Sequence, residues 1–329
     1  MKRMIRTLVA LLSLGVISPA AGGAEADADL PPSRAVEPEL YATGFELAAG
    51  PVLDSAGNLF VANYRGNGNI GLIMADGTAG VFCDLREAAP AEGREPRANG
   101  LKIDSQGRLI AADAGAGRLL RIAADGKNVE VLADRWEGKR FNHIYDVALD
   151  PEGNIYFSDP GSSRSDEPTG SVYRYDIGTT KVSQIATGLV RPTGLAVTPD
   201  KKHFCLAESG KFRVLIWDME ENGQLSNGRV LINFPTENHG EIVGGEFAPE
   251  GMIFDTAGRL YVAMDTAEVV NVVEVPSGEL IRQYAVEGSR VTNCHFHGGY
   301  LYVTVAAKEA VFRLELGVEG FRYNQPEEP

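Results

Sequence analysis

The sequence predicts an all-β protein, a six-bladed β-propeller, on three observations. First, one short motif occurs six times at intervals of 42 to 57 residues: an apolar strand, a turn with Asp and Gly, and a second strand that ends in small residues. Second, most copies are followed by another pair of strands with its own turn. Third, no long segment has the 3.6-residue apolar periodicity of a helix. Four-stranded sheets that repeat in this way bury their faces by packing radially into a closed ring.

The strands of each blade can be placed from the repeats. Every copy alternates apolar and polar residues and then turns on Asp-x-x-Gly or a variant, which is typical of a β-hairpin. The six copies begin at Gly50, Gly100, Asp146, Gly194, Gly251 and Asn293. The outer strand pairs are expected at residues 118–133, 171–186, 213–232 and 269–285. We expect residues 40–48 to pair with residues 310–316 and close the ring, and residues 235–248 to form a loop at the rim of a pocket.

Both ends of the chain are expected to lie outside the propeller, which we place at residues 41–320. Residues 1–24 combine a basic start, a short apolar run and small residues suited to cleavage, the three parts of a signal peptide. They predict export to the periplasm or the medium, and the apolar run is too short to span a bilayer. Residues 25–40 are rich in Pro, Asp and Glu and predict a disordered leader. Residues 321–329 are expected to be a C-terminal tail.

The charge balance limits the classes of partner. The formal net charge is −14 at pH 7 and the pI is near 4.9. A field of that sign repels nucleic acid and anionic membranes, so we expect neither as a partner once the signal is removed. Neutral small molecules and cations remain compatible. The three cysteines, Cys83, Cys205 and Cys294, have no metal-binding spacing and are expected to be small buried hydrophobic residues. Nothing in the composition indicates an oligomeric state.

Radial symmetry predicts where a functional pocket lies. Residues at equivalent positions in the blades point at the same axis, so the residue that precedes each copy of the motif should face the mouth of the channel. Most of these residues are polar, and a Gly follows in four copies, as suits a crowded centre. Converging polar groups call for water, a cation or a ligand. The six positions are Ala49, Asn99, Tyr145, Thr193, Glu250 and Thr292.

The order of these motifs resembles the gluconolactonase and senescence-marker-protein (regucalcin-like) family. The residues that carry the resemblance are RANGLKIDSQGRLIAAD (97–113), DVALDPEGNIYFSDP (146–160), RPTGLAVTPD (191–200) and PEGMIFDTAGRLYVA (249–263). The resemblance implies a six-bladed propeller that holds a divalent cation, most often calcium, at the channel mouth. It also implies hydrolysis of lactones or, in related enzymes, of phosphoesters.

The sequence departs from the pattern of this family at several ligand positions. Asn99 and Arg97 match it, and Asp146 matches one half of an expected Asn-Asp pair. Ala49 stands where the family has Glu, Tyr145 and Thr193 where it has Asn, and Glu250 where it has Asp. Since calcium takes six to eight oxygen ligands, these departures weaken the prediction of a metal. The metal ligands implied here are Glu250, Asn99 and Thr193.

Our principal hypothesis is a hydrolase that acts on a neutral lactone or ester. Glu250, Asp146 and Tyr145 are the catalytic candidates, and Asn99, Arg97, His143 and Thr193 are expected to bind substrate. In a metal version, a cation polarises the carbonyl group and acidifies bound water. In a metal-free version, enclosed Glu250 is the general base, and Tyr145 or Asn99 donates to the developing oxyanion.

Two alternatives stay open. The chain could be a non-catalytic propeller that binds a small molecule or a cation on a degenerate enzyme scaffold. It could also be a metal-free lyase similar to strictosidine synthase, whose propeller works with a Glu and no metal. Together with His143, the histidines His239, His295 and His297 complete no zinc pattern and favour a structural reading, although His295 could reach the channel.

Overall fold

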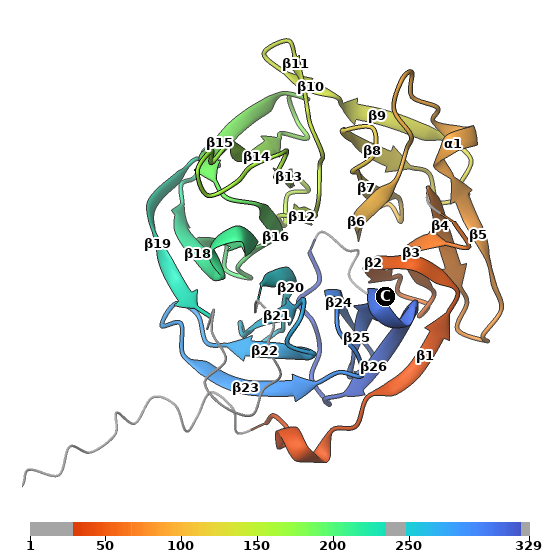
Figure 1. The fold of residues 1–329 in the computed structure, drawn as a ribbon, viewed down its shortest axis with the longest axis vertical. Helices are drawn as coiled ribbons and strands as arrows, with labels where there is room; N and C mark the ends of the chain where they lie inside the picture. The colour runs from red at the N-terminus through yellow and green to blue at the C-terminus, as the bar shows by residue number, and fades with distance from the viewer. Residues whose placement is uncertain (1–28, 67, 235–247, 324–329) are drawn as a thin grey trace, which may run out of the picture.

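Six four-stranded antiparallel sheets stand around a central channel, which confirms the predicted fold (Figure 1). The computed structural model describes residues 29–66, 68–234 and 248–323. Consecutive sheets are neighbours around the ring, and the sixth lies against the first. The predicted signal peptide, His239 and nearly all of the predicted rim loop at 235–248 lie outside the described residues.

The first three blades each use four strands in chain order, from the channel to the outer edge. Blade one contains β2 (Phe45–Leu53), β3 (Leu59–Tyr64), β4 (Asn69–Ile73) and β5 (Ala79–Asp84). Blade two contains β6 (Ala98–Ile103), β7 (Leu109–Asp113), β8 (Arg118–Ile122) and β9 (Val129–Ala133). Blade three contains β12 (Val147–Leu149), β13 (Ile155–Asp159), β14 (Gly170–Tyr175) and β15 (Val182–Leu189).

Blades four and five repeat this order, whereas blade six joins the two ends of the chain. Blade four contains β16 (Pro192–Val197), β17 (His203–Glu208), β18 (Arg213–Met219) and β19 (Leu225–Asn233). Blade five contains β20 (Pro249–Phe254), β21 (Leu260–Met264), β22 (Val269–Val273) and β23 (Leu280–Ala285). Blade six contains β24 (Val291–His297), β25 (Tyr300–Val305), β26 (Ala310–Glu315) and, at its outer edge, β1 (Glu39–Thr43).

The ring closes through β1 and β26, close to where the sequence predicts. Glu39 pairs with Arg313 and Thr43 with Ala310. The expected partner of β26 was residues 40–48, but the pairing ends at Thr43, because Phe45 already begins the inner strand of blade one. An N-terminal strand that completes the last blade leaves the ring without a gap, which protects strand edges.

Short elements fill several connections. α1 (Leu85–Ala88) and the small hairpin of β10 (Arg135–Trp136) and β11 (Lys139–Arg140) lie between blades. η2 (Ser209–Lys211) and η3 (Ala306–Lys308) lie within blades four and six, and η1 (Ser33–Ala35) precedes β1. None of the helices within the described ranges has the length and apolar character needed to cross a membrane.

The Asp that recurs in four of the six inner turns has a structural role. Oδ1 of Asp54 accepts hydrogen bonds from the backbone N–H groups of Ala56 and Asn58, both at 2.9 Å. Asp104, Asp150 and Asp255 make the same pair of bonds in their own blades. A side chain that accepts hydrogen bonds from two backbone N–H groups of a turn stabilises a tight hairpin. This role explains why Asp recurs in the motif without any part in catalysis.

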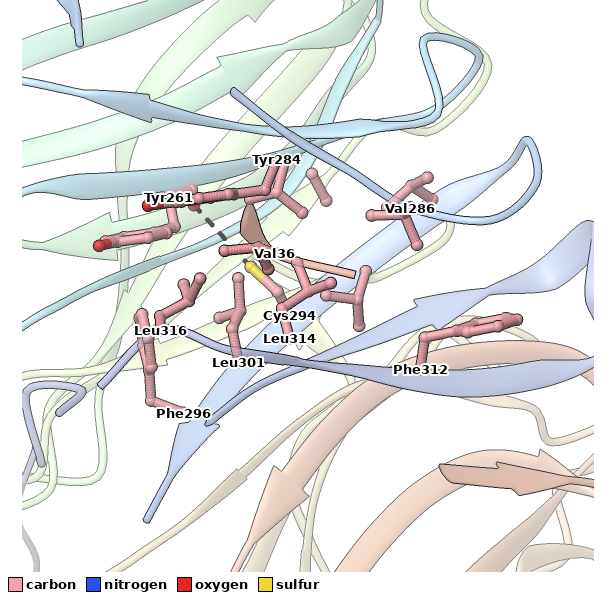
Figure 2. Packing of buried hydrophobic residues seen from close by; sticks show 14 of the residues in the cluster. Val36, Tyr261, Tyr284, Val286, Cys294, Phe296, Leu301, Phe312, Leu314 and Leu316 are labelled. Atoms are coloured by element: carbon pink, nitrogen blue, oxygen red, sulfur yellow. Dashed lines mark hydrogen bonds between the residues drawn. The ribbon is translucent and has the colours of Figure 1, made fainter. Parts of the chain in front are cut away.

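The hydrophobic core lies between adjacent blades. Figure 2 shows part of it between blades five and six, where Tyr261, Phe296 and Leu314 pack around Cys294. The Cys294 thiol is fully buried, and burial raises its pKa to about 12. Cys83 and Cys205 are also buried and free, as expected for small core residues.

The described part of the predicted leader is ordered, so that part of the prediction is wrong. Leu30 and Val36 are buried against blades five and six (Figure 2 labels Val36). The Tyr284 hydroxyl donates to the carbonyl of Pro31 at 3.0 Å, and Arg259 pairs with Asp29. A Pro-rich composition suggested disorder, but two apolar side chains are enough to dock the segment on an apolar surface already present.

The C-terminal residues also pack against the ring instead of leaving it as a tail. The N–H of Phe321 donates to Phe254 O at 2.9 Å, the N–H of Thr256 donates to Glu319 O, and the Tyr323 hydroxyl bonds to Val197 O. Phe254 and Val197 are the last residues of β20 and β16. The segment 319–323 therefore crosses the end of the channel opposite to the predicted mouth, and Figure 1 shows it passing through the middle of the ring.

Candidate active site at the channel mouth

Three of the six predicted mouth residues fasten neighbouring blades together. Nδ2 of Asn99 donates to the backbone oxygen of Tyr145 at 2.8 Å. The Thr193 hydroxyl donates to Pro249 O at 3.2 Å and lies 2.5 Å from the Ser209 hydroxyl. The Thr292 hydroxyl donates to Ala48 O at 2.7 Å. These bonds join blade two to three, four to five and six to one, so the polar side chains are used in part to hold the ring.

Glu250 and Tyr145 are the groups left for chemistry. The Glu250 side chain is almost completely buried, and its Oε2 has no hydrogen-bond partner among the described residues. The Tyr145 phenol lies beside the same carboxyl group, although no well-formed hydrogen bond joins the two. Among the neighbours that favour the charged carboxylate, Tyr145 has the largest effect on the pKa of Glu250. Glu250 is the second residue of β20 in blade five and Tyr145 precedes β12 of blade three, so the two groups meet across the channel, as radial symmetry predicts.

Burial sets the protonation of this pair. Removal from water raises the pKa of Glu250 to about 8, and the Tyr145 contact opposes this rise while the charge of Asp265 adds to it. Burial and the nearby Glu250 charge also raise the pKa of Tyr145 far above its ordinary value. At neutral pH the site therefore holds a neutral phenol beside a carboxyl group that is close to its titration point.

A narrow neck closes the channel just below the mouth. The residues after the mouth positions are Gly50, Gly100, Gly194 and Gly251, and in the two remaining blades they are Asp146 and Asn293. A Cβ on Gly100 would lie 2.0 Å from Oδ1 of Asp146, and one on Gly251 would lie 2.1 Å from Cγ of Asn293. Nδ2 of Asn293 donates to Oδ2 of Asp146 at 3.2 Å.

Asp146 is therefore placed at the neck and not at the reacting end of the site. Its Oδ1 accepts from the backbone N–H of Val147, and its Oδ2 accepts from Asn293. Burial raises the pKa of Asp146, and Lys102 below it acts in the opposite direction. The sequence grouped Asp146 with Glu250 and Tyr145 as catalytic, but its two oxygens already have donors, so a positioning role fits its contacts better.

Three charged residues at the mouth were missed by sequence reasoning. Asp265 follows β21 and its charge reaches Glu250. Arg191 acts on both Glu250 and Asp265, and Arg290 acts on Asp265. The N–H groups of Arg290 and Val291 donate to the backbone oxygen of Asp265, which ties the loop after β21 to the start of blade six.

A register comparison would have revealed Asp265. Asp113, Asp159 and Glu208 end the second strands of their blades, and each accepts backbone N–H bonds from the loop before its inner strand. In blade five the equivalent position is Met264, which pairs with Pro249 as Glu208 pairs with Pro192. The acid is displaced by one residue to Asp265. Successive side chains along a strand point in opposite directions. This displacement therefore turns the carboxylate away from the loop before the inner strand and toward the mouth.

Arg97 and His143 share a groove at the rim. They line it together with Glu95, Asn142 and neighbouring residues between blades two and three. The His143 ring lies 6.0 Å from the Tyr145 ring, centroid to centroid. Burial and the nearby Arg97 cation lower the pKa of His143, so its imidazole is neutral at pH 7. The structure thus brings both predicted substrate-binding residues to a groove that leads toward Tyr145.

The comparison with known proteins agrees with this geometry. The sequence profile described as SMP-30/Gluconolactonase/LRE-like region matches residues 98–307. The chain belongs to this family. It is 29% identical over 296 residues to a gluconolactonase of Zymomonas mobilis, which covers 84% of this chain and 80% of that protein.

Two further relatives show the range of this similarity. A strictosidine synthase-like protein 4 of Arabidopsis thaliana is 32% identical over 121 residues, 33% of this chain and 32% of that protein. The crystal structure of the calcium-binding protein regucalcin from Agrobacterium tumefaciens superimposes with a TM-score of 0.70 at 19% identity, covering 89% of this chain and 97% of that chain.

The mouth of this member of the SMP-30/gluconolactonase family does not fit a calcium ion. Among the implied ligands, only Glu250 offers a carboxylate. Asn99 donates its amide N–H to Tyr145 O and so can offer only its one neutral amide oxygen, and the Thr193 hydroxyl is shared with Ser209 and Pro249. Ala49 offers no oxygen on its side chain. Within the described ranges no three His, Cys, Asp or Glu side chains come together as a metal cluster. This donor set falls well short of the six to eight oxygens of a calcium site.

Two further histidines considered from the sequence, His295 and His297, lie away from the mouth. His295 and His297 are on β24, below the neck, and both line a cavity near the other end of the channel. They do not approach Glu250. The expectation that His295 reaches the channel is met, at the far side of the Asp146–Asn293 bond.

Proposed function

We propose that this protein is a gluconolactonase-like hydrolase of neutral lactones or esters, with Glu250 as its general base. The observation that carries the proposal is an orphaned carboxylate oxygen of Glu250, buried at the channel mouth beside the Tyr145 phenol. A general base needs a carboxyl group with a free oxygen, a site enclosed enough to raise its pKa toward neutral, and access to a bound water. Glu250 has the first two, and its place at the mouth is consistent with the third.

The proposed reaction uses only residues at the mouth. Ionised Glu250 takes a proton from a water whose oxygen bonds to the carbonyl carbon of the substrate. The carbonyl oxygen becomes an oxyanion that accepts a hydrogen bond from the Tyr145 phenol. The bond from that carbon to the ring oxygen then breaks, and Glu250 returns its proton to the leaving alkoxide. The product is a hydroxy acid.

The rim groove supplies the substrate contacts. Arg97 and the neutral imidazole of His143 face one groove. Arg97 can donate hydrogen bonds to the hydroxyl groups of a sugar-like lactone, and the imidazole can donate one and accept one. Arg191 provides a second cation near the reacting end. Asn99 and Thr193, which were expected to touch substrate, instead hold the blades that carry Tyr145 and Glu250.

The experiment is a hydrolysis panel of aldonolactones and simple esters, run with and without a chelator. We expect lactone turnover that is unchanged by the chelator, since the mouth lacks a calcium donor set. Turnover that is lost with chelator and restored by calcium would contradict the metal-free reaction, but it would still support the assignment of the protein as a hydrolase. No turnover with any lactone or ester would contradict the hydrolase itself.

A second candidate rests on the same glutamate. The local similarity to a strictosidine synthase-like protein and the buried carboxyl group of Glu250 at the mouth are compatible with an enzyme that joins or cleaves without a metal. A non-catalytic binding propeller is the third reading. A lactone that raises the melting temperature without being consumed would favour that reading over both enzymes.

We also propose that the protein is exported, on the pattern of residues 1–24. Amino-terminal sequencing of the protein from its native host, after fractionation, tests this. A cytoplasmic protein with an intact first segment would contradict it.

A further inference from the structure

One position on the second strand of each blade lies beside the start of the inner strand and is always small. Ser158 has this position in blade three, and Thr304, which pairs with Asn293, has it in blade six. The other four blades have Ala there, and all six side chains are buried. Packing alone therefore does not require a hydroxyl group at this position. The four alanines are Ala62, Ala112, Ala207 and Ala263.

The Ser158 hydroxyl joins blade three to blade four. It accepts a hydrogen bond from the N–H of Asp146 at 3.2 Å and donates to the backbone oxygen of Thr193 at 2.6 Å. Asp146 directly follows Tyr145, whose own N–H donates to the backbone oxygen of Ser158 at 2.8 Å. Ser158 therefore holds the backbone that carries the phenol and links it to the next blade.

The Ser209 hydroxyl joins blade four to blade five. It donates to the backbone oxygen of Pro249, the residue directly before Glu250. The Thr193 hydroxyl donates to the same oxygen at 3.2 Å. Two hydroxyl groups of blade four thus converge on the backbone that carries the Glu250 carboxyl group.

These bonds form one continuous chain between the two groups proposed for the reaction. Blade four lies between blades three and five (Figure 1), so the separation of Tyr145 and Glu250 depends on how both neighbours are held to blade four. The chain runs through Ser158, Thr193 and Ser209, and all three side chains are buried. Hydrogen bonds in such surroundings do not compete with water and hold their partners firmly.

We propose that Ser158 and Ser209 are positioning residues, which act through Thr193 to hold the Tyr145 phenol at its working distance from the Glu250 carboxyl group. The inference rests on the proposed function, because it ties these serines to the base and the oxyanion donor of that reaction. Each serine gives its hydroxyl proton to a backbone oxygen, so neither takes part in proton transfer. Ala at position 158 would keep the fold, as it does in four other blades, and would lose the link.

The titration of Glu250 reports the separation of the two groups, because the Tyr145 contact lowers its pKa. The Glu250 carboxyl carbon can be followed by NMR in substrate-free protein labelled with carbon-13 at glutamate, as the signal that is missing in Glu250→Gln. We expect Ser158→Ala and Ser209→Ala each to raise the midpoint by about half a unit. The other groups whose charges act on Glu250 are Asp265, Arg191 and Asp146.

Two controls separate positioning from a general loss of packing. Thr304→Val removes the equivalent buried hydroxyl of blade six, which donates to Asn293 O, and should leave the Glu250 midpoint unchanged. In a Tyr145→Phe background, Ser158→Ala should cause no further shift, because the contact that it loosens is already absent.

In lactone hydrolysis, each serine variant should lower kcat about tenfold with little change in KM. The titration needs no substrate, so a protein that shows the expected shifts but no turnover would contradict the hydrolase and still support the positioning role. Unchanged midpoints in both serine variants, or shifts that persist in full in the Tyr145→Phe background, would overturn the proposal.

Discussion

Asn293 of blade six donates a hydrogen bond to Asp146 of blade three, the blade directly opposite in the ring. The bond crosses the channel axis at 3.2 Å, and the other four blades place a glycine at the same level. The neck separates the mouth around Glu250 from the cavity around His295 at the other end of the channel.

The first prediction concerns Glu250 as the base. Glu250→Gln keeps the shape of the side chain but cannot accept a proton, so we expect kcat for lactone hydrolysis to fall about 10² to 10⁴-fold with a smaller change in KM. Since the pKa of Glu250 is about 8, the wild-type rate should rise with pH and level off above that value. Glu152→Gln, at an exposed glutamate, is the control. A variant at position 250 that retains the wild-type rate and pH profile would remove Glu250 from the reaction.

The second prediction concerns stability against pH. The folded protein holds the Glu250 proton up to about pH 8, whereas an unfolded glutamate loses it near its ordinary pKa of 4.5. The folded state binds more protons in this interval, so its free energy of unfolding falls as pH rises from 4.5 to 8. Glu250→Gln removes this contribution, which is on the order of a few kcal/mol. Denaturant melts of both proteins at several pH values should show a smaller decline in the variant. Parallel curves would show that Glu250 does not titrate in this range.

The third prediction concerns the Tyr145 phenol. Tyr145→Phe removes the donor proposed for the oxyanion, and we expect kcat to fall about 10²-fold. The same change removes the contact that lowers the pKa of Glu250, so the midpoint of the pH–rate profile should move to higher pH. Steady-state kinetics across pH measures both effects. Tyr300→Phe, at a partly buried tyrosine of blade six, should change neither. A lower rate with an unmoved midpoint would contradict the contact between the phenol and the carboxyl group.

The fourth prediction separates the charges around Glu250. Asp265 raises the pKa of Glu250 and Arg191 lowers it. Asp265→Asn should therefore move the midpoint of the pH–rate profile to lower pH, and Arg191→Met should move it to higher pH, each by about half a unit to one unit. Arg164→Met, at an exposed arginine, serves as the charge control. Shifts of the same sign in the two variants would show that neither charge acts on Glu250 directly.

The fifth prediction tests the neck. A Cβ on Gly251 would lie 2.1 Å from Asn293 Cγ, so Gly251→Ala forces the inner strands apart. We expect a loss of about 3 kcal/mol in the free energy of unfolding. The matched control is Gly80→Ala on β5, where nothing lies within 4 Å of the added carbon and φ is not positive. Equal stability of the two variants in urea melts would show that the neck is less crowded than the structure indicates.

The sequence by itself determined the fold and the neighbourhood of the site. Six copies of one hairpin motif can bury their faces only in a ring, and a ring directs equivalent residues at one axis. For that reason Glu250 and Tyr145 could be placed together although they lie 105 residues apart (250 − 145). The same reasoning could not predict that the side chains of Asn99, Thr193 and Thr292 would bond to the backbone of neighbouring blades. A repeat determines the backbone position of a residue, but it does not determine which hydrogen-bond partner the side chain finds.

Only the tertiary structure decided the parts that depend on contacts between blades and on the chain ends. Asp146 and Asn293 meet because the axis is narrow. Asp265 faces Glu250 because the acidic residue of blade five stands one position later than the acidic residue that ends the second strand in blades two, three and four. The segments around Leu30 and Phe321 pack against the ring because the closed ring presents apolar surface to them, although their composition suggested a leader and a tail. Local composition and period are properties of a short stretch of chain, whereas these contacts depend on surfaces that exist only after the six blades have closed.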